Sequence, residues 1–348
     1  MSAENNTFNA WAGVAKNAPL KQMQLTLKEW DEDSVEMNIT HCGICGSDIH
    51  TLEAHWGPTD YPCVVGHEIV GVVTRVGKNV TNLKVGDRAG VGAQCHSCHE
   101  CQKCTAGKEN NCPKHTGTYN SKWPSGDKTY GGYADKWRGD YRFAFKVPDN
   151  LPSEVAATFF CAGVTTYAPL RRTNVNEKSV VGVMGIGGLG HYGVLWAKAM
   201  GAKVIGMSSS ERKRDVAKEL GCDEYVNTND EKALAAYKGK LTHLLLTGCG
   251  PDFSWEKYLT LIQPDGHFIN VNAPDWKFPP LNPLLLIMTQ VNISGSLIGS
   301  PKEIEEMLAF AAEKEVRPWI SLIPMKDVNK ALEDFNAGKP RFRFVLEN

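Results

Sequence analysis

The glycine-rich segment G-I-G-G-L-G, residues 185–190, constrains the fold more than any other feature of this chain. It follows a short apolar run, Ser179 to Met184, and precedes a stretch whose apolar residues recur at steps of three and four, which predicts a helix. In such a strand–turn–helix the first glycine permits the tight turn, the second lets the backbone approach a pyrophosphate, and the third lets the helix pack on the strand. The segment therefore predicts a dinucleotide site formed by Gly185, Ile186, Gly187, Gly188, Leu189 and Gly190.

The residues after the next predicted strand decide which dinucleotide fits. A site for NAD usually carries an acidic residue at this strand end, where it binds the ribose 2′-hydroxyl. Here three serines and two cations follow Met207, with Glu211 between them. Hydroxyl and cationic groups would bind a 2′-phosphate, which an acidic side chain would repel. The alternative is that Ser210 only caps a helix and that both cations are solvated. We expect NADP(H), bound by Ser208, Ser209, Ser210, Arg212 and Lys213.

Strands and helices are distributed unevenly along the chain. Residues 161–298 contain short apolar runs that alternate with predicted helices, which indicates a doubly wound parallel sheet. Residues 1–160 instead contain β-branched runs separated by glycine and proline. Residues 299–348 end in a predicted strand, which cannot satisfy its own backbone and is expected to return to the first domain. We therefore expect an α/β protein in which a Rossmann domain, 161–298, is inserted into a mostly-β catalytic domain, 1–160 and 299–348. Three consecutive domains would leave the last segment too short for a core.

Three dispersed residues have the chemistry of a catalytic zinc site. Cys45 stands in H-C-G-I-C-G-S-D-I-H, His67 in G-H-E and Cys161 in C-A-G-V-T-T-Y. Two thiolates and one imidazole leave a fourth zinc position open, unlike the closed four-ligand sites that only support a fold. Zinc has no redox chemistry, so it would polarise a carbonyl or stabilise an alkoxide while a nicotinamide carries the hydride. Glu68 is either an alternative fourth ligand in the absence of substrate or the partner of a nearby arginine.

Ser47, Asp48 and His50 follow Cys45 closely and offer a route for a proton. An alcohol bound at zinc must lose its proton before the hydride leaves. We expect Ser47 to pass that proton through the cofactor ribose to His50, whose imidazole titrates near neutral pH. Asp48 is expected to orient a ligand imidazole, that of His67. The alternative is that Ser47 bonds only to the backbone and that His50 is an ordinary surface histidine.

A second group of cysteines is compact. Cys95, Cys98, Cys101 and Cys104 are each separated by two residues, and Cys112 follows after seven more. Either the first four bind one ion or the last four do. We favour the last four, because a loop closed by a distant ligand restrains more of the chain. Four thiolates make a closed structural zinc site, so two zinc ions per chain are predicted. An iron–sulfur cluster is the alternative, as are disulfides in an oxidising compartment.

Bulk properties exclude some classes of function. The net charge is −1, from 38 basic and 39 acidic residues, which offers no cationic field for nucleic acid or an anionic membrane. The sequence shows no apolar run of about twenty residues and no charged-then-apolar leader at Met1. We therefore expect a cytoplasmic protein with reduced, metal-binding cysteines and a small-molecule substrate.

Together these motifs resemble the zinc-dependent medium-chain alcohol dehydrogenases, specifically their cinnamyl alcohol dehydrogenase-like branch. The resemblance covers essentially the whole chain. It rests on the zinc signature G-H-E-x2-G-x5-G-x2-V at 66–80, and more narrowly on C-A-G-V-T at 161–165, S-S-S at 208–210 and S-L-I-G at 296–299. The resemblance implies a GroES-like catalytic domain, a homodimer, and a structural zinc bound by the last four clustered cysteines, which leaves Cys95 as an extra. It also implies cofactor contacts from Ser47, Thr165, Ser296, Leu297 and Ile298.

The predicted function is that of an NADP(H)-dependent zinc alcohol dehydrogenase, or aldehyde reductase, acting on primary aromatic (cinnamyl-type) or medium aliphatic substrates. A polyol or secondary-alcohol dehydrogenase is one alternative. Cys161 as the third zinc ligand argues against it. A non-catalytic NADPH- or zinc-binding protein is another, against which Ser47 and His50 argue, because binding alone needs no proton route. The bulky residues expected to shape the substrate cleft are His55, Trp56, Tyr119 and Trp123.

Overall fold

The computed structural model describes residues 6–274 and 276–348, which divide into two compact units. The first unit comprises the described residues up to Val164, together with Ile298–Glu315 and Trp319–Asn348. The second comprises Thr165–Leu297 and the short stretch Val316–Pro318. The chain therefore leaves the first unit once, builds the second, and returns.

The second unit is built on a six-stranded parallel sheet with the order β12-β11-β10-β13-β14-β15. Numbered along the chain, this is the order 3-2-1-4-5-6 of dinucleotide-binding sheets. The predicted Rossmann fold is confirmed. Its strands are β10 (Val180–Met184), β11 (Lys203–Ser208), β12 (Glu224–Asn227), β13 (Leu241–Leu246), β14 (Ile262–Asn270) and β15 (Asn292–Gly295).

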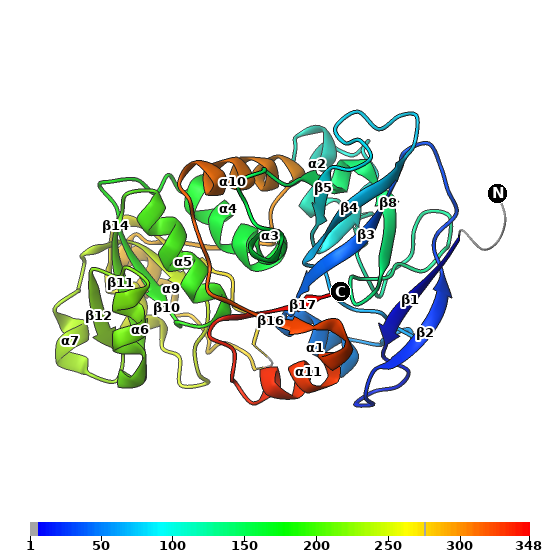
Figure 1. Cartoon of the computed structure of the whole chain (residues 1–348). Coiled ribbons are helices and arrows are strands. Elements are labelled where there is room, and N and C mark those ends of the chain that lie inside the picture. The colour runs from blue at the N-terminus through cyan, green and yellow to red at the C-terminus, as the bar shows by residue number, and fades with distance from the viewer. Residues whose placement is uncertain (1–5, 275) are drawn as a thin grey trace. The chain divides into compact units, whose positions relative to one another are not determined.

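Helices lie alongside this sheet, as Figure 1 shows for α5 and α6 next to β10, β11 and β12. The apolar residues of β10 and β13 are buried because both faces of a parallel sheet are covered. A 3₁₀ turn, Glu211–Lys213, leads directly into α6. The helices are α4 (Val164–Arg172), α5 (Gly188–Ala199), α6 (Arg214–Glu219), α7 (Glu231–Ala235), α8 (Trp255–Leu259) and α9 (Pro283–Thr289).

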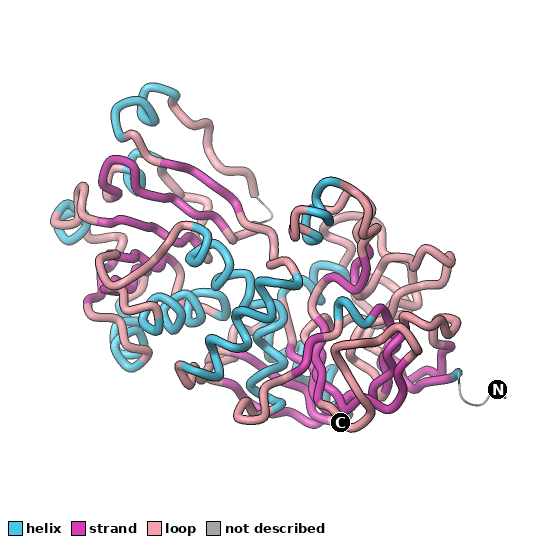
Figure 2. Tube along the Cα trace, turned by 90° about the horizontal axis from the view of Figure 1, so that it is seen from above, coloured by secondary structure: helices cyan, strands magenta, loops and turns pink. Residues whose placement is uncertain are grey.

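The first unit contains a seven-stranded, mostly antiparallel sheet with the order β16-β17-β3-β4-β5-β9, in which β8 also pairs with β3. The C-terminal strand pairs with β3, where Val345 lies opposite Gly43, so the tail returns to the first unit. Figure 2 shows the strands of the sheets in magenta. The strands are β3 (Ser34–Gly43), β4 (Ile69–Val76), β5 (Arg88–Val91), β8 (Lys136–Asp140), β9 (Phe145–Lys146), β16 (Ile320–Pro324) and β17 (Arg343–Glu347).

Two small hairpin sheets complete the β structure of this unit, β1 (Thr7–Ala12) with β2 (Lys21–Thr26) and β6 (Gln94–His96) with β7 (Thr116–Gly117). α10 begins with a capping box, in which Ser300 and Glu303 satisfy each other's backbone amides. No helix among the described residues is long and apolar enough to cross a bilayer. The helices are α1 (Gly46–Leu52), α2 (Gln102–Thr105), α3 (Ser153–Thr158), α10 (Pro301–Glu313) and α11 (Val328–Asn336).

Candidate active site and metal centres

The four residues predicted to hold a catalytic metal lie together in the first unit. Cys45, His67, Glu68 and Cys161 each place one ligand atom within 4.8 Å of the others. Cys45 is the N-cap of α1, and His67 and Glu68 immediately precede β4. Cys161 lies in a π-helical turn, residues 159–163, between α3 and α4. Such turns are rare and are frequent at functional sites.

Two buried atoms of this group have no hydrogen-bond partner among the described residues. They are His67 Nε2 and Glu68 Oε2. Buried polar atoms in folded proteins almost always have a partner, so each unpartnered atom needs an explanation. The Sγ atoms of Cys45 and Cys161 are 3.7 Å apart beside them. Two sulfurs, an imidazole nitrogen and a carboxylate oxygen that converge in this way fit a zinc ion.

The electrostatics of the group favour thiolate at Cys45. The hydrogen bond from Cys161 lowers the pKa of Cys45 well below that of an ordinary thiol, although burial opposes this shift. Cys161 retains the shared proton, so the pKa of its thiol is raised well above the ordinary value. Burial disfavours a charge on His67, but the neighbouring Cys45 outweighs burial and raises the His67 pKa to about 9. A dication would displace these protons, because it needs deprotonated ligands.

Glu68 uses its two carboxylate oxygens differently. Oε1 accepts a hydrogen bond from Nη2 of Arg343, and both side chains are buried. Oε2 belongs to the metal-ligand group and is unpartnered. Burial raises the pKa of Glu68 to about 7, although Arg343 opposes the shift. A Cβ at Gly43 would lie 1.9 Å from Oε2, so only glycine leaves room for this carboxylate. Glu68 therefore has both features predicted as alternatives: one oxygen bonds to an arginine, and the other faces the metal-ligand group.

The imidazole of His67 is oriented by Tyr119, which was predicted only to shape the substrate cleft. Tyr119 Oη lies 2.9 Å from His67 Nδ1, whereas the nearest oxygen of Asp48 is 3.7 Å away. Asp48 is fully buried and accepts hydrogen bonds from the backbone of Cys45 and Gly66 and from Tyr133 Oη. Asp48 therefore holds the loops that carry two ligands, and Tyr119 makes the direct contact with the ligand ring.

Replacing Tyr119 with phenylalanine is expected to weaken zinc binding at this site by about 10- to 100-fold, the usual cost of losing a ligand's hydrogen-bond partner. The substitution keeps the ring, which stacks on His67 at a centroid distance of 5.3 Å, and removes only the hydroxyl. Competition with a chelator measures the affinity. Tyr130→Phe is the matched control, because the Tyr130 ring packs against Phe8 instead, with the ring planes tilted. Equal zinc affinities in the two variants would show that the hydroxyl does not orient the ligand.

The predicted proton-route residues lie on α1. Ser47 Oγ is 3.6 Å from Cys45 Sγ, and His50 follows three residues later, on the same face of the helix. The His50 ring stacks on Trp56 at 4.5 Å, and its Nδ1 is 3.3 Å from Nδ1 of His55. His55 and Trp56 therefore lie next to His50. Trp123 is only 7% exposed, packs in the core of the first unit and lines a cavity together with His96 and Asp140.

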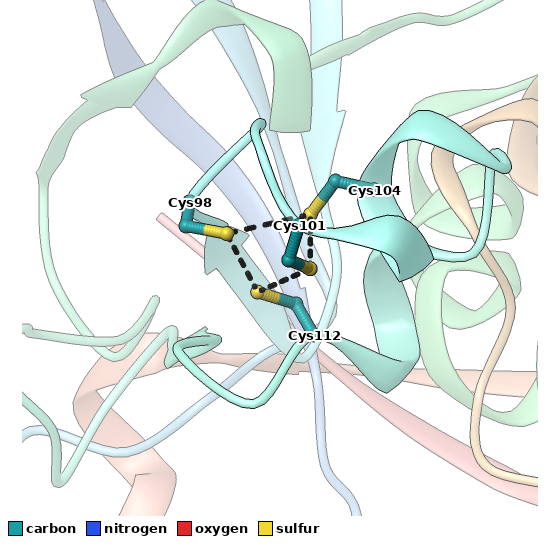
Figure 3. Close-up of side chains that lie close together, drawn as sticks. All are labelled: Cys98, Cys101, Cys104 and Cys112. Carbon is teal, nitrogen blue, oxygen red and sulfur yellow. Dashed lines mark hydrogen bonds between the residues drawn. The ribbon is translucent and has the colours of Figure 1, made fainter.

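The compact cysteines form a second group in the first unit (Figure 3). Their sulfurs are separated by 3.5 to 3.9 Å. Zinc–sulfur bonds of about 2.3 Å in a tetrahedron require sulfur–sulfur distances of about 3.8 Å. Cys95 lies outside the group, and its Sγ donates to the carbonyl of Gly117 at 3.4 Å. The structure therefore brings together the last four cysteines, Cys98, Cys101, Cys104 and Cys112.

The glycine-rich segment of the second unit connects β10 to α5. Gly185 has a φ of 95°, and a Cβ there would lie 2.6 Å from the carbonyl oxygen of Gly248. A Cβ at Gly190 would lie 1.9 Å from the carbonyl oxygen of Gly185, so the helix packs directly on the turn. At Gly187, the N-cap of α5, a Cβ would meet nothing within 4 Å. The segment also contains Ile186, Gly188 and Leu189. Because the N-terminus of α5 is open at Gly187, it suits a phosphate.

A cavity of about 260 Å³ lies beside this segment and includes Ser208 and Ser209 in its lining. Ser210 is the N-cap of the 3₁₀ turn, but its side chain makes no capping bond and instead accepts from Arg212 Nε at 3.3 Å. Glu211 pairs with Arg214 at 2.8 Å and accepts from Asn227. The Glu211 carboxylate is therefore bound by the Arg214 guanidinium and the Asn227 amide.

The other predicted cofactor residues are Lys213, within the second unit, and a set near its first and last residues, Thr165, Ser296, Leu297 and Ile298. Lys213 ends the 3₁₀ turn and is half-buried. Thr165 lies in the first turn of α4 and is half-buried. Ser296 Oγ accepts a hydrogen bond from Arg172 at 3.2 Å. Leu297 is exposed, and Ile298, the first residue after the unit, has a φ of 38°.

The chain is similar to known alcohol dehydrogenases in sequence and in structure. Residues 31–149 match the alcohol dehydrogenase GroES-like domain family, and residues 188–313 match the zinc-binding dehydrogenase family. NADP-dependent alcohol dehydrogenase C 1 of Mycolicibacterium smegmatis is 40% identical over 98% of both chains. A cinnamyl alcohol dehydrogenase from Sorghum bicolor has a TM-score of 0.93 and 34% identity, over 98% of this chain and 97% of that one. The enzyme of this class from Helicobacter pylori, solved with NADP(H), has a TM-score of 0.90 and 32% identity over 98% of both chains.

The chain therefore belongs to the zinc-dependent medium-chain alcohol dehydrogenases, a class of oxidoreductases. Within that family it is similar to the cinnamyl alcohol dehydrogenase-like branch, so the resemblance found in the sequence is confirmed.

Proposed function

We propose that this protein is an NADP(H)-dependent alcohol dehydrogenase that interconverts primary aromatic (cinnamyl-type) or medium aliphatic alcohols and aldehydes. The observation that carries the proposal is the group of Cys45, His67, Glu68 and Cys161, with two buried atoms left unpartnered. A zinc ion bound there would act as a Lewis acid on the substrate oxygen, and the nicotinamide would exchange the hydride.

The residues of the chain have separate parts in this reaction. Cys45, His67 and Cys161 would hold the metal, and Glu68 would serve as the fourth ligand when substrate is absent. Ser47, next to Cys45, is placed to take the proton of the substrate hydroxyl. His50, on the same helix, would exchange that proton with solvent.

The choice of NADP(H) rests on the serines and cations after β11 and on relatives that use this cofactor. Converting Ser209 to aspartate is expected to raise the KM for NADPH by about 100-fold, because like charges brought together cost several kcal/mol. The KM for NADH should change little, since NADH lacks the 2′-phosphate. Steady-state kinetics with both cofactors measures the effect, and Ser209→Asn is the uncharged control. Equal effects on NADPH and NADH would remove the basis for the cofactor assignment.

A substrate panel tests the proposed reaction. We expect cinnamaldehyde and medium aliphatic aldehydes to be reduced with NADPH at a higher kcat/KM than the ketones and sugars related to secondary alcohols and polyols. Preference for fructose or mannitol would favour the polyol dehydrogenase alternative. No turnover of any carbonyl by zinc-loaded protein would favour a binding protein.

We also propose that the protein is a homodimer. β15 is an edge strand of the parallel sheet, and all four of its residues are exposed. Large exposed apolar side chains gather on β15, on α9 and after β15, and edge strands and apolar patches of this kind favour association. A sedimenting mass of two chains at micromolar concentration is the expected result, and a monomer would contradict it. The side chains are Leu284, Ile287, Met288, Ile293 and Leu297.

A further inference from the structure

We propose that the first unit carries a third metal site, formed by His96, His99 and Asp140, for a divalent transition-metal ion such as Zn²⁺. Each of these residues offers one ligand atom within 4.8 Å of the others. The site is separate from both zinc sites described above, because neither uses these side chains. His96 and His99 lie between the clustered cysteines in the sequence, and no role in the proposed reaction accounts for them.

The carboxylate oxygen of Asp140 lies between the two imidazoles, close to a ligand nitrogen of each. Oδ2 of Asp140 is 2.9 Å from Nδ1 of His96 and 3.0 Å from Nε2 of His99. Zinc bonds of about 2.0–2.1 Å in a tetrahedron hold ligand atoms about 3.4 Å apart, about 0.4 Å further than in these two pairs. Imidazole and carboxylate together are ligands that zinc accepts. A divalent ion therefore needs only small side-chain movements to bind all three.

The backbone holds the three side chains in place. His96 ends β6, and Asp140 ends β8. His99 has a φ of 58°, in the left-handed region that residues other than glycine seldom adopt. The imidazole rings of the two histidines meet at a centroid distance of 5.1 Å, with their planes nearly perpendicular. The convergence thus arises from strand ends and a constrained turn.

Neighbouring groups orient the ligands. Nδ1 of His99 lies 3.3 Å from Oγ of the buried Ser97, which leaves Nε2 for the ion. Arg142 donates to Oδ1 of Asp140 at 2.7 Å, which leaves Oδ2 for the ion. Partners of this kind commonly fix the orientation of metal ligands. Ser97 Oγ is also 3.4 Å from Cys104 Sγ, so the proposed site shares a hydrogen-bond network with the structural zinc site.

There is room for water to complete the coordination. His96 and Asp140 line a cavity of about 230 Å³, which also includes Asp31, Asp33, Lys28 and Arg142. Three carboxylates face two cations in this lining, so the surroundings do not repel a cation. Without a metal, the same atoms form two hydrogen bonds from the imidazoles to Asp140. The experiment must therefore distinguish a metal site from a hydrogen-bonded cluster.

Titration of the holoprotein with zinc chloride tests the proposal. Isothermal calorimetry and elemental analysis after buffer exchange should show a third zinc ion per chain beyond the two already bound. His99→Asn, in which asparagine tolerates the left-handed backbone, and His96→Gln should each weaken this third ion at least about tenfold. Both variants should keep two zinc ions and full alcohol dehydrogenase activity, which shows that they are folded.

His115→Asn is the matched control, because His115 follows Cys112 but lies outside the proposed site. This variant should bind the third ion as the original protein does. A stoichiometry of two in the original protein overturns the proposal and leaves a hydrogen-bonded cluster. A third ion that survives both His96→Gln and His99→Asn is an adventitious ion only. Loss of the third ion in His115→Asn would also overturn the proposal.

Discussion

Replacing Cys45 with serine is expected to lower kcat by about a thousandfold or more and to remove one of two zinc ions from each chain. Cys45 is the ligand whose thiolate is most favoured, and it lies between Cys161 and His67. Losing it removes the Lewis acid, whose stabilisation of the transition state is worth several kcal/mol, and about 4 kcal/mol corresponds to a thousandfold in rate. Elemental analysis and an NADPH oxidation assay measure the two effects.

The control for this experiment is Cys63→Ala. Cys63 is only 3% exposed, and it belongs to neither cysteine group. This variant loses a buried sulfur and should keep both zinc ions and most of the activity. If Cys45→Ser retained two tightly bound zinc ions and normal turnover, the catalytic site would have been assigned to the wrong residues.

Replacing Cys112 with serine is expected to release the structural zinc and to lower the free energy of unfolding by several kcal/mol. Cys112 closes the group from the far end of its loop, so its loss frees the chain between Cys98 and Cys112. The free energy of binding a structural zinc ion contributes directly to folding, at about 10–16 kcal/mol in small zinc peptides. Thermal unfolding and zinc content check the prediction.

Cys95→Ser is the matched control, because Cys95 lies close by in sequence but outside the group. The serine hydroxyl would replace a thiol that donates to the Gly117 carbonyl, so the cost should stay near 1 kcal/mol and both zinc ions should remain. Zinc loss in Cys95→Ser but not in Cys112→Ser would reverse the assignment of the ligands.

Motifs that are local in sequence were the most predictable features. The glycine segment occupies a strand–turn–helix because its φ of 95° at Gly185 and its close contact at Gly190 permit few other arrangements. Cysteine and histidine are predictable as ligands because few other side chains bind zinc. The Rossmann sheet followed from the alternation of apolar runs and helical stretches. β12 and β15 gave no such signal, because only one of their eight residues is buried.

Partners brought close only by the fold could not be predicted. Arg343 reaches Glu68 across 275 residues, through the pairing of β17 with β3. Tyr119 reaches His67 because the chain after β7 passes beside the loop before β4. Such contacts depend on strand register and loop path, which periodicity and composition do not specify. An aromatic residue or an arginine outside a motif therefore gives no signal from its own position.

The pairing of Glu68 with Arg343 has a consequence for biosynthesis. A ribosome makes the ligands long before it makes Arg343, and domains generally fold in the order in which they emerge. Until the last strand is released, the Glu68 carboxyl lacks its cationic partner, and β3 lacks one of its neighbours. Metal loading at the catalytic centre is therefore expected to follow the synthesis of β17. A stop codon at or before position 343 would yield a chain in which Glu68 lacks its cationic partner.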